Sequence, residues 1–188
     1  HSSQNEQDSR HYAKASKTMM LEPSDSAECL EFAKMALSLS EKFDTPVILR
    51  LSTRVAHSRG LAEVGERVDN GLKEYKKDPM KYVMMPGMAI KKHIVVEQRV
   101  LDQTAWAETA PINTVEMNDT KIGVITAGIS YTYAKEALGD KASYLKLGCV
   151  YPLPVKLIKD FAAKCDKVYV LEELDPFIEE HCRQIGVD

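Results

Sequence analysis

Short apolar runs alternate with amphipathic stretches through the last third of the chain, and this alternation constrains the fold most strongly. Apolar runs typical of β-strands and stretches with one apolar face typical of α-helices follow one another in order: 121–128, 130–138, 143–150, 155–165, 167–173 and 177–185. Strands that alternate with helices favour a parallel sheet with right-handed connections. The sequence therefore predicts an α/β domain over residues 120–188.

A similar unit occurs near the start of the chain. The first ten residues are polar and predict a loop, and a short helix is expected at 12–17. Strands are then expected at 18–22 and 47–52, with a helix at 26–43 between them. Asp25 precedes this helix and Glu28 follows three residues later, which is the spacing of a capping box. We expect residues 1–58 to be the end of a first α/β domain.

The middle of the chain lacks a clear period. Charged residues crowd residues 73–77, and breakers stand at Asp78-Pro79 and at Met85-Pro86-Gly87. Only residues 89–107 carry a mixed pattern that we interpret as a helix. Residues 59–119 are therefore predicted to be a partly helical interdomain segment.

Composition argues against two classes of partner. Charged residues make up 28% of the 188 positions and the formal net charge is −3, so no broad basic surface is expected. Nucleic acid and anionic membranes are therefore disfavoured. The longest apolar runs also fall far short of the roughly 20 residues that a membrane-spanning helix needs.

The cysteines give no sign of a metal or disulfide framework. Cys29, Cys149, Cys165 and Cys182 are far apart and form no C-x-x-C pair. We expect four reduced thiols in a cytoplasmic protein, buried as small hydrophobic side chains, and no iron–sulfur cluster in this part of the chain. The first residue is His1 rather than methionine, within a polar run, which predicts that the parent chain begins upstream.

The polar opening is the first candidate binding site. It offers an imidazole, hydroxyls and amides that can hold a carboxylate or a carbonyl group, on His1, Ser2, Ser3, Gln4 and Asn5. Loops at strand ends of α/β domains are where ligands usually bind. The alternative is a solvated loop without function, and composition alone favours it.

A second candidate follows the strand expected at 47–52. Arg54, His57 and Arg59 stand just past its end and could contact an anion. Arginines at such positions more often form surface ion pairs. The turn at residues 126–130 places backbone amides at a helix start, but it lacks the spacing of nucleotide-binding loops, so a structural turn is favoured.

Three acids follow the strand expected at 167–173. Glu172, Glu173 and Asp175 could bind a metal or accept a proton. The simpler interpretation is that Asp175 caps the next helix while both glutamates stay solvated, and we favour it.

Five blocks of this sequence resemble, almost end to end, the alpha subunit of indolepyruvate ferredoxin oxidoreductase. They are HSSQNEQDSRHYAKASK, MLEPSDS, LSEKFDTPVILRLSTRVAHSRG, SYLKLGCVYPLPVKLIKDFA and VYVLEELDPFIEE. The first and last blocks are the most specific. The segment between Arg59 and Thr120 resembles this family less specifically.

The resemblance implies a fold and a reaction. The fold would be the end of a thiamine-binding, pyrimidine-type parallel-sheet domain, followed by a transketolase C-terminal-like three-layer α/β domain that is truncated here. The parent enzyme would decarboxylate an arylpyruvate oxidatively, form an aryl-acetyl-CoA and reduce ferredoxin. His1 would orient the substrate carboxylate or transfer a proton, and Gln4 and Asn5 would supply hydrogen bonds.

The resemblance also implies cofactors and partners. The parent enzyme would carry thiamine diphosphate with magnesium and 4Fe-4S clusters, and would act with a beta subunit, ferredoxin and CoA. The residues expected to hold these cofactors lie outside this sequence. We therefore expect the 188 residues alone to bind no thiamine diphosphate and to be inactive.

Two alternatives stay open. The first keeps the reaction and changes the substrate to pyruvate or 2-oxoglutarate. The second makes the chain a non-catalytic α/β binding or assembly module.

Overall fold

The computed structural model describes residues 7–69, 71–72 and 74–187. The first part of the chain forms a short helix, two strands and two further helices: α1 (Arg10–Ser16), β1 (Met19–Leu21), α2 (Ser26–Phe43), β2 (Val47–Leu49) and α3 (Thr53–His57). The middle part contains α4 (Pro79–Tyr82) and α5 (Pro86–Ala107). The last part comprises β3 (Thr114–Glu116), β4 (Ile122–Ala127), α6 (Gly128–Leu138), η1 (Gly139–Lys141), β5 (Ser143–Leu147), β6 (Cys149–Tyr151), α7 (Val155–Ala162), β7 (Lys167–Leu171) and α8 (Phe177–Gln184).

The start of α2 confirms Asp25 as the helix cap, but the return bond of the predicted capping box goes to Ser24, one residue before the cap. The Asp25 side chain accepts a hydrogen bond from the backbone amide of Glu28 at 2.9 Å. The Glu28 carboxylate in turn accepts the backbone amide of Ser24 at 2.8 Å. The first bond satisfies an amide that the helix leaves free, and the second fixes the loop between β1 and α2.

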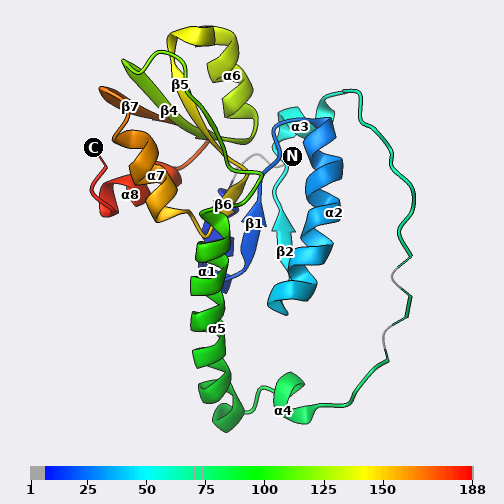
Figure 1. The fold of residues 1–188 in the computed structure, drawn as a ribbon. Coiled ribbons are helices and arrows are strands. Elements are labelled where there is room, and N and C mark those ends of the chain that lie inside the picture. The colour runs from blue at the N-terminus through cyan, green and yellow to red at the C-terminus, as the bar shows by residue number, and fades with distance from the viewer. Residues whose placement is uncertain (1–6, 70, 73, 188) are drawn as a thin grey trace.

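The chain builds two sheets. One has the order β2-β1-β6 and the other the order β3-β5-β4-β7. In the larger sheet, α6 covers one face and α7 and α8 cover the other (Figure 1). Neighbouring residues of β4 point to opposite faces, because Val124 packs with α6 and Ile125 packs with the cluster that includes α7. This confirms the three-layer α/β arrangement that the resemblance implied.

Both sheets also carry an antiparallel edge strand, which the alternation of strands and helices did not predict. Strand β1 pairs in parallel with β2 but antiparallel with β6, and β5 pairs in parallel with β4 but antiparallel with β3. The reason is the connections, since β3 and β6 are not joined to their neighbours by the helical crossovers that enforce parallel pairing.

The single strand predicted at residues 143–150 is wrong, because the chain changes sheets at Gly148. Its amide donates to the Ile112 carbonyl at 3.1 Å and to the Asn113 side chain at 2.9 Å, and its carbonyl accepts from the Glu22 amide at 2.8 Å. The residues before Gly148 pair in the larger sheet, and those after it pair in the smaller one. A break in the apolar run is invisible in the sequence because both halves are buried.

A shared core joins the two sheets. The largest apolar cluster contains Ala13 and Met20 of the first part together with Ile125, Leu145 and Phe161 of the last part. Strand β3, from the segment predicted to lie between the domains, pairs in the larger sheet. Strand β6, from the predicted second domain, pairs in the smaller sheet with β1. That division into three segments stays a prediction. In the part of the chain that the structure describes, no helix combines the length and the apolar character that crossing a membrane demands.

The close passage at Gly148 gives a stability prediction. A methyl group there would lie 2.5 Å from the Ile112 carbonyl oxygen and 3.0 Å from the Phe32 ring. We expect Gly148→Ala to lower the free energy of unfolding by about 1–3 kcal/mol, as overpacking does. Gly87→Ala, which meets open space in α5, should be neutral or stabilising by up to about 1 kcal/mol. Urea unfolding of both variants checks this, and equal effects would contradict it.

Candidate functional site

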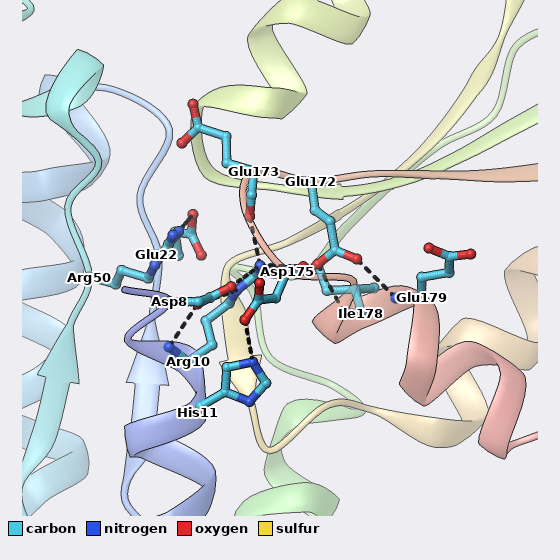
Figure 2. A network of polar contacts seen from close by, with 10 residues as sticks. All are labelled: Asp8, Arg10, His11, Glu22, Arg50, Glu172, Glu173, Asp175, Ile178 and Glu179. Atoms are coloured by element: carbon cyan, nitrogen blue, oxygen red, sulfur yellow. Dashed lines mark hydrogen bonds and ion pairs between the residues drawn. The ribbon is translucent and has the colours of Figure 1, made fainter. Parts of the chain in front are cut away.

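The carboxyl ends of four strands meet, and charged residues follow three of them. Glu22 follows β1, Arg50 follows β2, Gly128 follows β4 and Glu172 follows β7. Arg50 pairs with Glu22, and Gly128 lies directly against the Glu22 carboxylate. Figure 2 shows Glu172 on the other side of the same cluster, reached by Arg10. Carboxyl ends of parallel strands are the usual place for ligand sites in α/β proteins.

Arg10 lies at the centre of this cluster and is only 1% exposed. Its guanidinium donates to both carboxylate oxygens of Asp8, at 2.5–3.0 Å. It also donates to the Glu172 carboxylate at 2.5 Å and to the carbonyls of Glu173 and Asp175 at 2.7 and 2.9 Å. Because the planar guanidinium presents several donors in a fixed fork, one side chain fixes the loop before α1 to the loop after β7 (Figure 2).

Glu172 connects this arginine to α8. Its carboxylate accepts the backbone amides of Ile178 and Glu179, both at 3.0 Å, so it caps the helix. The prediction that Asp175 caps this helix is therefore wrong, because Glu172 accepts these amides instead. The prediction that both glutamates stay solvated is wrong for Glu172. Between Glu172 and α8, Leu174 has a φ of 71°, in the left-handed region. The loop turns there, and the Glu172 carboxylate lies at the first turn of α8.

Asp8 and Glu22 respond differently to burial. Burial would raise the pKa of Asp8, but the hydrogen bonds from the side chain and backbone of Arg10 outweigh this and lower it. Burial also raises the pKa of Glu22, and the attraction of Arg50 and Arg10 does not offset it. One Glu22 oxygen, Oε2, has no hydrogen-bond partner among the described residues.

The turn at residues 126–130 is closed by the chain itself. Gly128 has a φ of 51°, which favours glycine, and any side chain there would overlap the Glu22 carboxylate. Glu22 therefore lies directly against the first residue of α6. These contacts agree with the prediction that the turn at residues 126–130 is structural.

An open hollow of about 560 Å³ borders the cluster. It is lined by Gln7, Asp8, His11, Tyr12, Leu174 and Asp175. His11 Nε2 lies 2.9 Å from the Asp175 carboxylate, and both side chains are exposed.

The described residues do not fit a resident metal or cluster. Asp8, His11 and Asp175 have ligand atoms within 4.8 Å of one another, but both Asp8 oxygens are already bonded to Arg10. The four cysteines stand in separate parts of the fold, two of them buried and two half-buried. Burial raises the pKa of Cys149 to about 12 and that of Cys182 to about 11, so both thiols are protonated near neutral pH.

The residues predicted from the sequence have separate outcomes. His1, Ser2, Ser3, Gln4 and Asn5 lie outside the described residues, so their roles stay predictions. Arg54 and His57 lie on α3, a helix that the sequence did not predict, and Arg59 follows it. All three side chains are exposed, and the anion contact stays a prediction.

Sequence reasoning missed the charged centre of the site. Asp8 and Arg10 were placed in a polar loop, Glu22 at the end of the strand expected at 18–22 and Arg50 within the strand expected at 47–52, and none of them was given a role. A usable signal existed, because a charged residue directly follows an apolar strand at both Glu22 and Arg50. The partners of Arg10 lie more than 160 positions away in the sequence, and no local pattern identifies them.

The fold of this chain is shared by a solved structure. A solved structure described as 2-oxoglutarate:ferredoxin oxidoreductase from Magnetococcus marinus, with 2-oxoglutarate, coenzyme A and succinyl-CoA bound, superposes with a TM-score of 0.59. It matches 89% of this chain and 37% of that chain at 18% identity, so the likeness concerns the fold alone. No protein-family model matches the sequence.

Curated relatives then identify the family. The chain is 38% identical over 192 residues to the indolepyruvate oxidoreductase subunit IorA of Archaeoglobus fulgidus. It is 39% identical over 198 residues to that of Thermococcus kodakarensis and 40% identical over 184 residues to that of Methanothermobacter thermautotrophicus. These alignments cover 95–100% of this chain. The chain belongs to the family of indolepyruvate oxidoreductase IorA subunits, and it spans about 31% of the length of the first two relatives.

The buried arginine gives a second prediction. Arg10→Met leaves Asp8 and Glu172 without their cation, and we expect the free energy of unfolding to fall by about 3–5 kcal/mol. The matched control is Arg183→Met, which removes an exposed pair with Glu179 one helical turn away and should cost less than about 0.5 kcal/mol. Urea unfolding of both variants checks the difference. A loss below 1 kcal/mol for the first, roughly the value of a surface pair, would contradict the proposed role.

Glu22 gives a prediction about pH. A carboxyl group whose pKa is raised by folding holds its proton more tightly in the folded chain, so its contribution to stability falls as pH rises from about 4.5 towards the folded-state pKa. We expect the free energy of unfolding of the wild type, minus that of Glu22→Gln, to decrease across this range. Urea unfolding at a series of pH values measures it. A constant or rising difference would contradict the assignment.

Proposed function

We propose that this chain is part of an oxidoreductase that oxidatively decarboxylates arylpyruvates, with indolepyruvate as the representative substrate, to aryl-acetyl-CoA with reduction of ferredoxin. The observation that carries the proposal is the alignment of the whole chain with relatives named indolepyruvate oxidoreductase subunit IorA. The meeting of four strand ends around Arg10 supports it, because ligands of α/β proteins bind at such ends.

The residues of this chain would hold one wall of the substrate pocket. His1 would orient the substrate carboxylate or transfer a proton, Gln4 and Asn5 would donate hydrogen bonds, and Ser2 and Ser3 would line the same loop. The anchoring of Asp8 by Arg10 supports this, because it fixes the chain three residues after Asn5. Positioning of this kind lowers the entropy lost when substrate binds.

Arg54, His57 and Arg59 would contact an anionic group of a ligand. Their exposure beside α3 leaves them free to do so. The arginine fork suits phosphate and carboxylate groups.

The cofactors and partners are proposed for the parent protein. Thiamine diphosphate with magnesium would supply the decarboxylation chemistry, and 4Fe-4S clusters would carry electrons to ferredoxin. A beta subunit and CoA would complete the reaction, in the cytoplasm. We propose, as the resemblance implies, that these 188 residues alone bind no thiamine diphosphate and are inactive.

A second candidate keeps the reaction and changes the substrate to 2-oxoglutarate or pyruvate. The observation in its favour is the fold likeness to a protein described as a 2-oxoglutarate:ferredoxin oxidoreductase. A non-catalytic α/β module is the remaining alternative.

Dye reduction by the parent complex separates these candidates. The cluster-loaded complex would be assayed without oxygen, with CoA, a viologen dye and indolepyruvate, pyruvate or 2-oxoglutarate in turn. We expect turnover with indolepyruvate and little with the other two. Turnover with only pyruvate or 2-oxoglutarate would identify that oxoacid as the substrate in place of indolepyruvate. No turnover at all would favour the non-catalytic module.

A further inference from the structure

A pocket separate from the charged cluster lies between α1, the end of α5, α8 and the loop that joins β6 to α7 (Figure 1). Its volume is about 170 Å³. A cavity of about 150 Å³ holds one benzene ring, so this pocket has room for a single aromatic ring. It shares no lining residue with the hollow beside His11 and Asp175. The pocket is therefore a second place on this chain with room for a small molecule.

The interior of the pocket is mainly apolar. Phe177 and Leu153 are 7% and 5% exposed, and Pro152 and Val155 line the pocket beside them. Tyr151 adds a second, half-buried aromatic ring. Such walls favour an aromatic group, because its transfer out of water is favourable and its ring can pack edge-to-face or offset against other rings.

Helix α8 presents a polar face to this pocket. Ile178 and Cys182 stand one helical turn apart and pack in the largest apolar cluster. Glu180, His181 and Gln184 follow one another at intervals of one and three positions, and all three line the pocket. Residues three and four positions apart lie on the same side of a helix. The helix therefore turns an apolar face to the core and a polar face to the pocket.

His181 is the most buried of these three polar residues. Burial lowers the pKa of its imidazole, and the positive charge of Lys14 lowers it further, so the ring is neutral near pH 7. Its Nε2 atom is buried and has no hydrogen-bond partner among the described residues. A buried polar atom without a partner is rare in folded proteins. A polar group of a bound molecule would supply the missing partner, since a neutral imidazole offers one donor and one acceptor.

Two opposite charges stand at the mouth of the pocket. Lys14 on α1 and Glu180 on α8 both line it and are both exposed. The Lys14 ammonium lies 5.9 Å from the centre of the Phe177 ring. Neither Lys14 nor Glu180 forms an ion pair with a described residue. An apolar interior with one cation and one anion at its mouth is complementary to a molecule that carries a ring and both charges.

We propose that this pocket binds an aromatic amino acid in its free, zwitterionic form. The ring would occupy the apolar interior, the carboxylate would pair with Lys14, and the ammonium would pair with Glu180. His181 Nε2 would form one further hydrogen bond with the charged end of the ligand. This site is distinct from the wall of the oxoacid pocket proposed above.

Calorimetry on the parent protein that contains this chain tests the site with three probes. L-Phenylalanine carries the ring and both charges, 3-phenylpropanoate lacks the ammonium, and phenethylamine lacks the carboxylate. We expect saturable binding of L-phenylalanine. Each of the other two should bind about tenfold or more weakly, because each loses one charge-assisted hydrogen bond.

Two surface variants then locate the bound molecule. Glu180→Gln should weaken L-phenylalanine about tenfold without weakening 3-phenylpropanoate, because only the ammonium contacts Glu180. Lys14→Met should weaken both, because both carry the carboxylate. The matched control is Glu179→Gln, on the same helix but outside the pocket lining, and it should change neither affinity.

Three results would overturn the proposal. The first is no saturable heat with L-phenylalanine up to about 5 mM. The second is equal affinity for L-phenylalanine and 3-phenylpropanoate, which would mean that the ammonium is not recognised. The third is binding that both Glu180→Gln and Lys14→Met leave unchanged, which would place the ligand elsewhere on the parent protein. Because calorimetry needs no turnover, each result is independent of the proposed oxidation.

Discussion

The buried ion pair between Arg10 and Asp8 is the interaction on which the rest of the site depends. A guanidinium that is 1% exposed has lost its water and is stable only if its donors find protein acceptors. Here they find two carboxylates and two backbone carbonyls, and the carbonyls belong to the loop after β7. The same arginine therefore fixes the N-terminal loop, and through Glu172 the start of α8.

Two further contacts hold the two sheets together. At Gly148 the chain passes from one sheet to the other with no room for a side chain. Lys146, just before it, is buried and pairs with Glu28, whose own carboxylate fixes the loop after β1. These contacts explain why the carboxyl ends of β1, β2, β4 and β7 face one cluster, although they belong to different sheets. A ligand bound at this edge would touch groups from both.

Local patterns in the sequence predicted much of the fold, and long-range contacts set the limit. The helix at 26–43 was predicted because its cap and apolar stripe are local, and the structure confirms it. The strand at 143–150 was predicted as one piece because its two halves are equally apolar, although they bind different partners. Arg10 was predicted to be a loop residue, because the acceptors of its hydrogen bonds lie far away in the sequence, at Glu172, Glu173 and Asp175. Residues 1–5, where the predicted site is centred, lie outside the described part of the chain.

Native-state hydrogen exchange tests the central claim, that the charged cluster joins both sheets into one cooperative unit. The amide of Arg50 bonds to Leu21 in the smaller sheet, and the amide of Ile178 bonds to Glu172 beside the larger one. If the cluster couples them, both amides should exchange with the same opening free energy and the same denaturant dependence. Opening of the Ile178 amide at a clearly lower free energy, while Arg50 stays protected, would show that the two sheets open independently and would contradict the account.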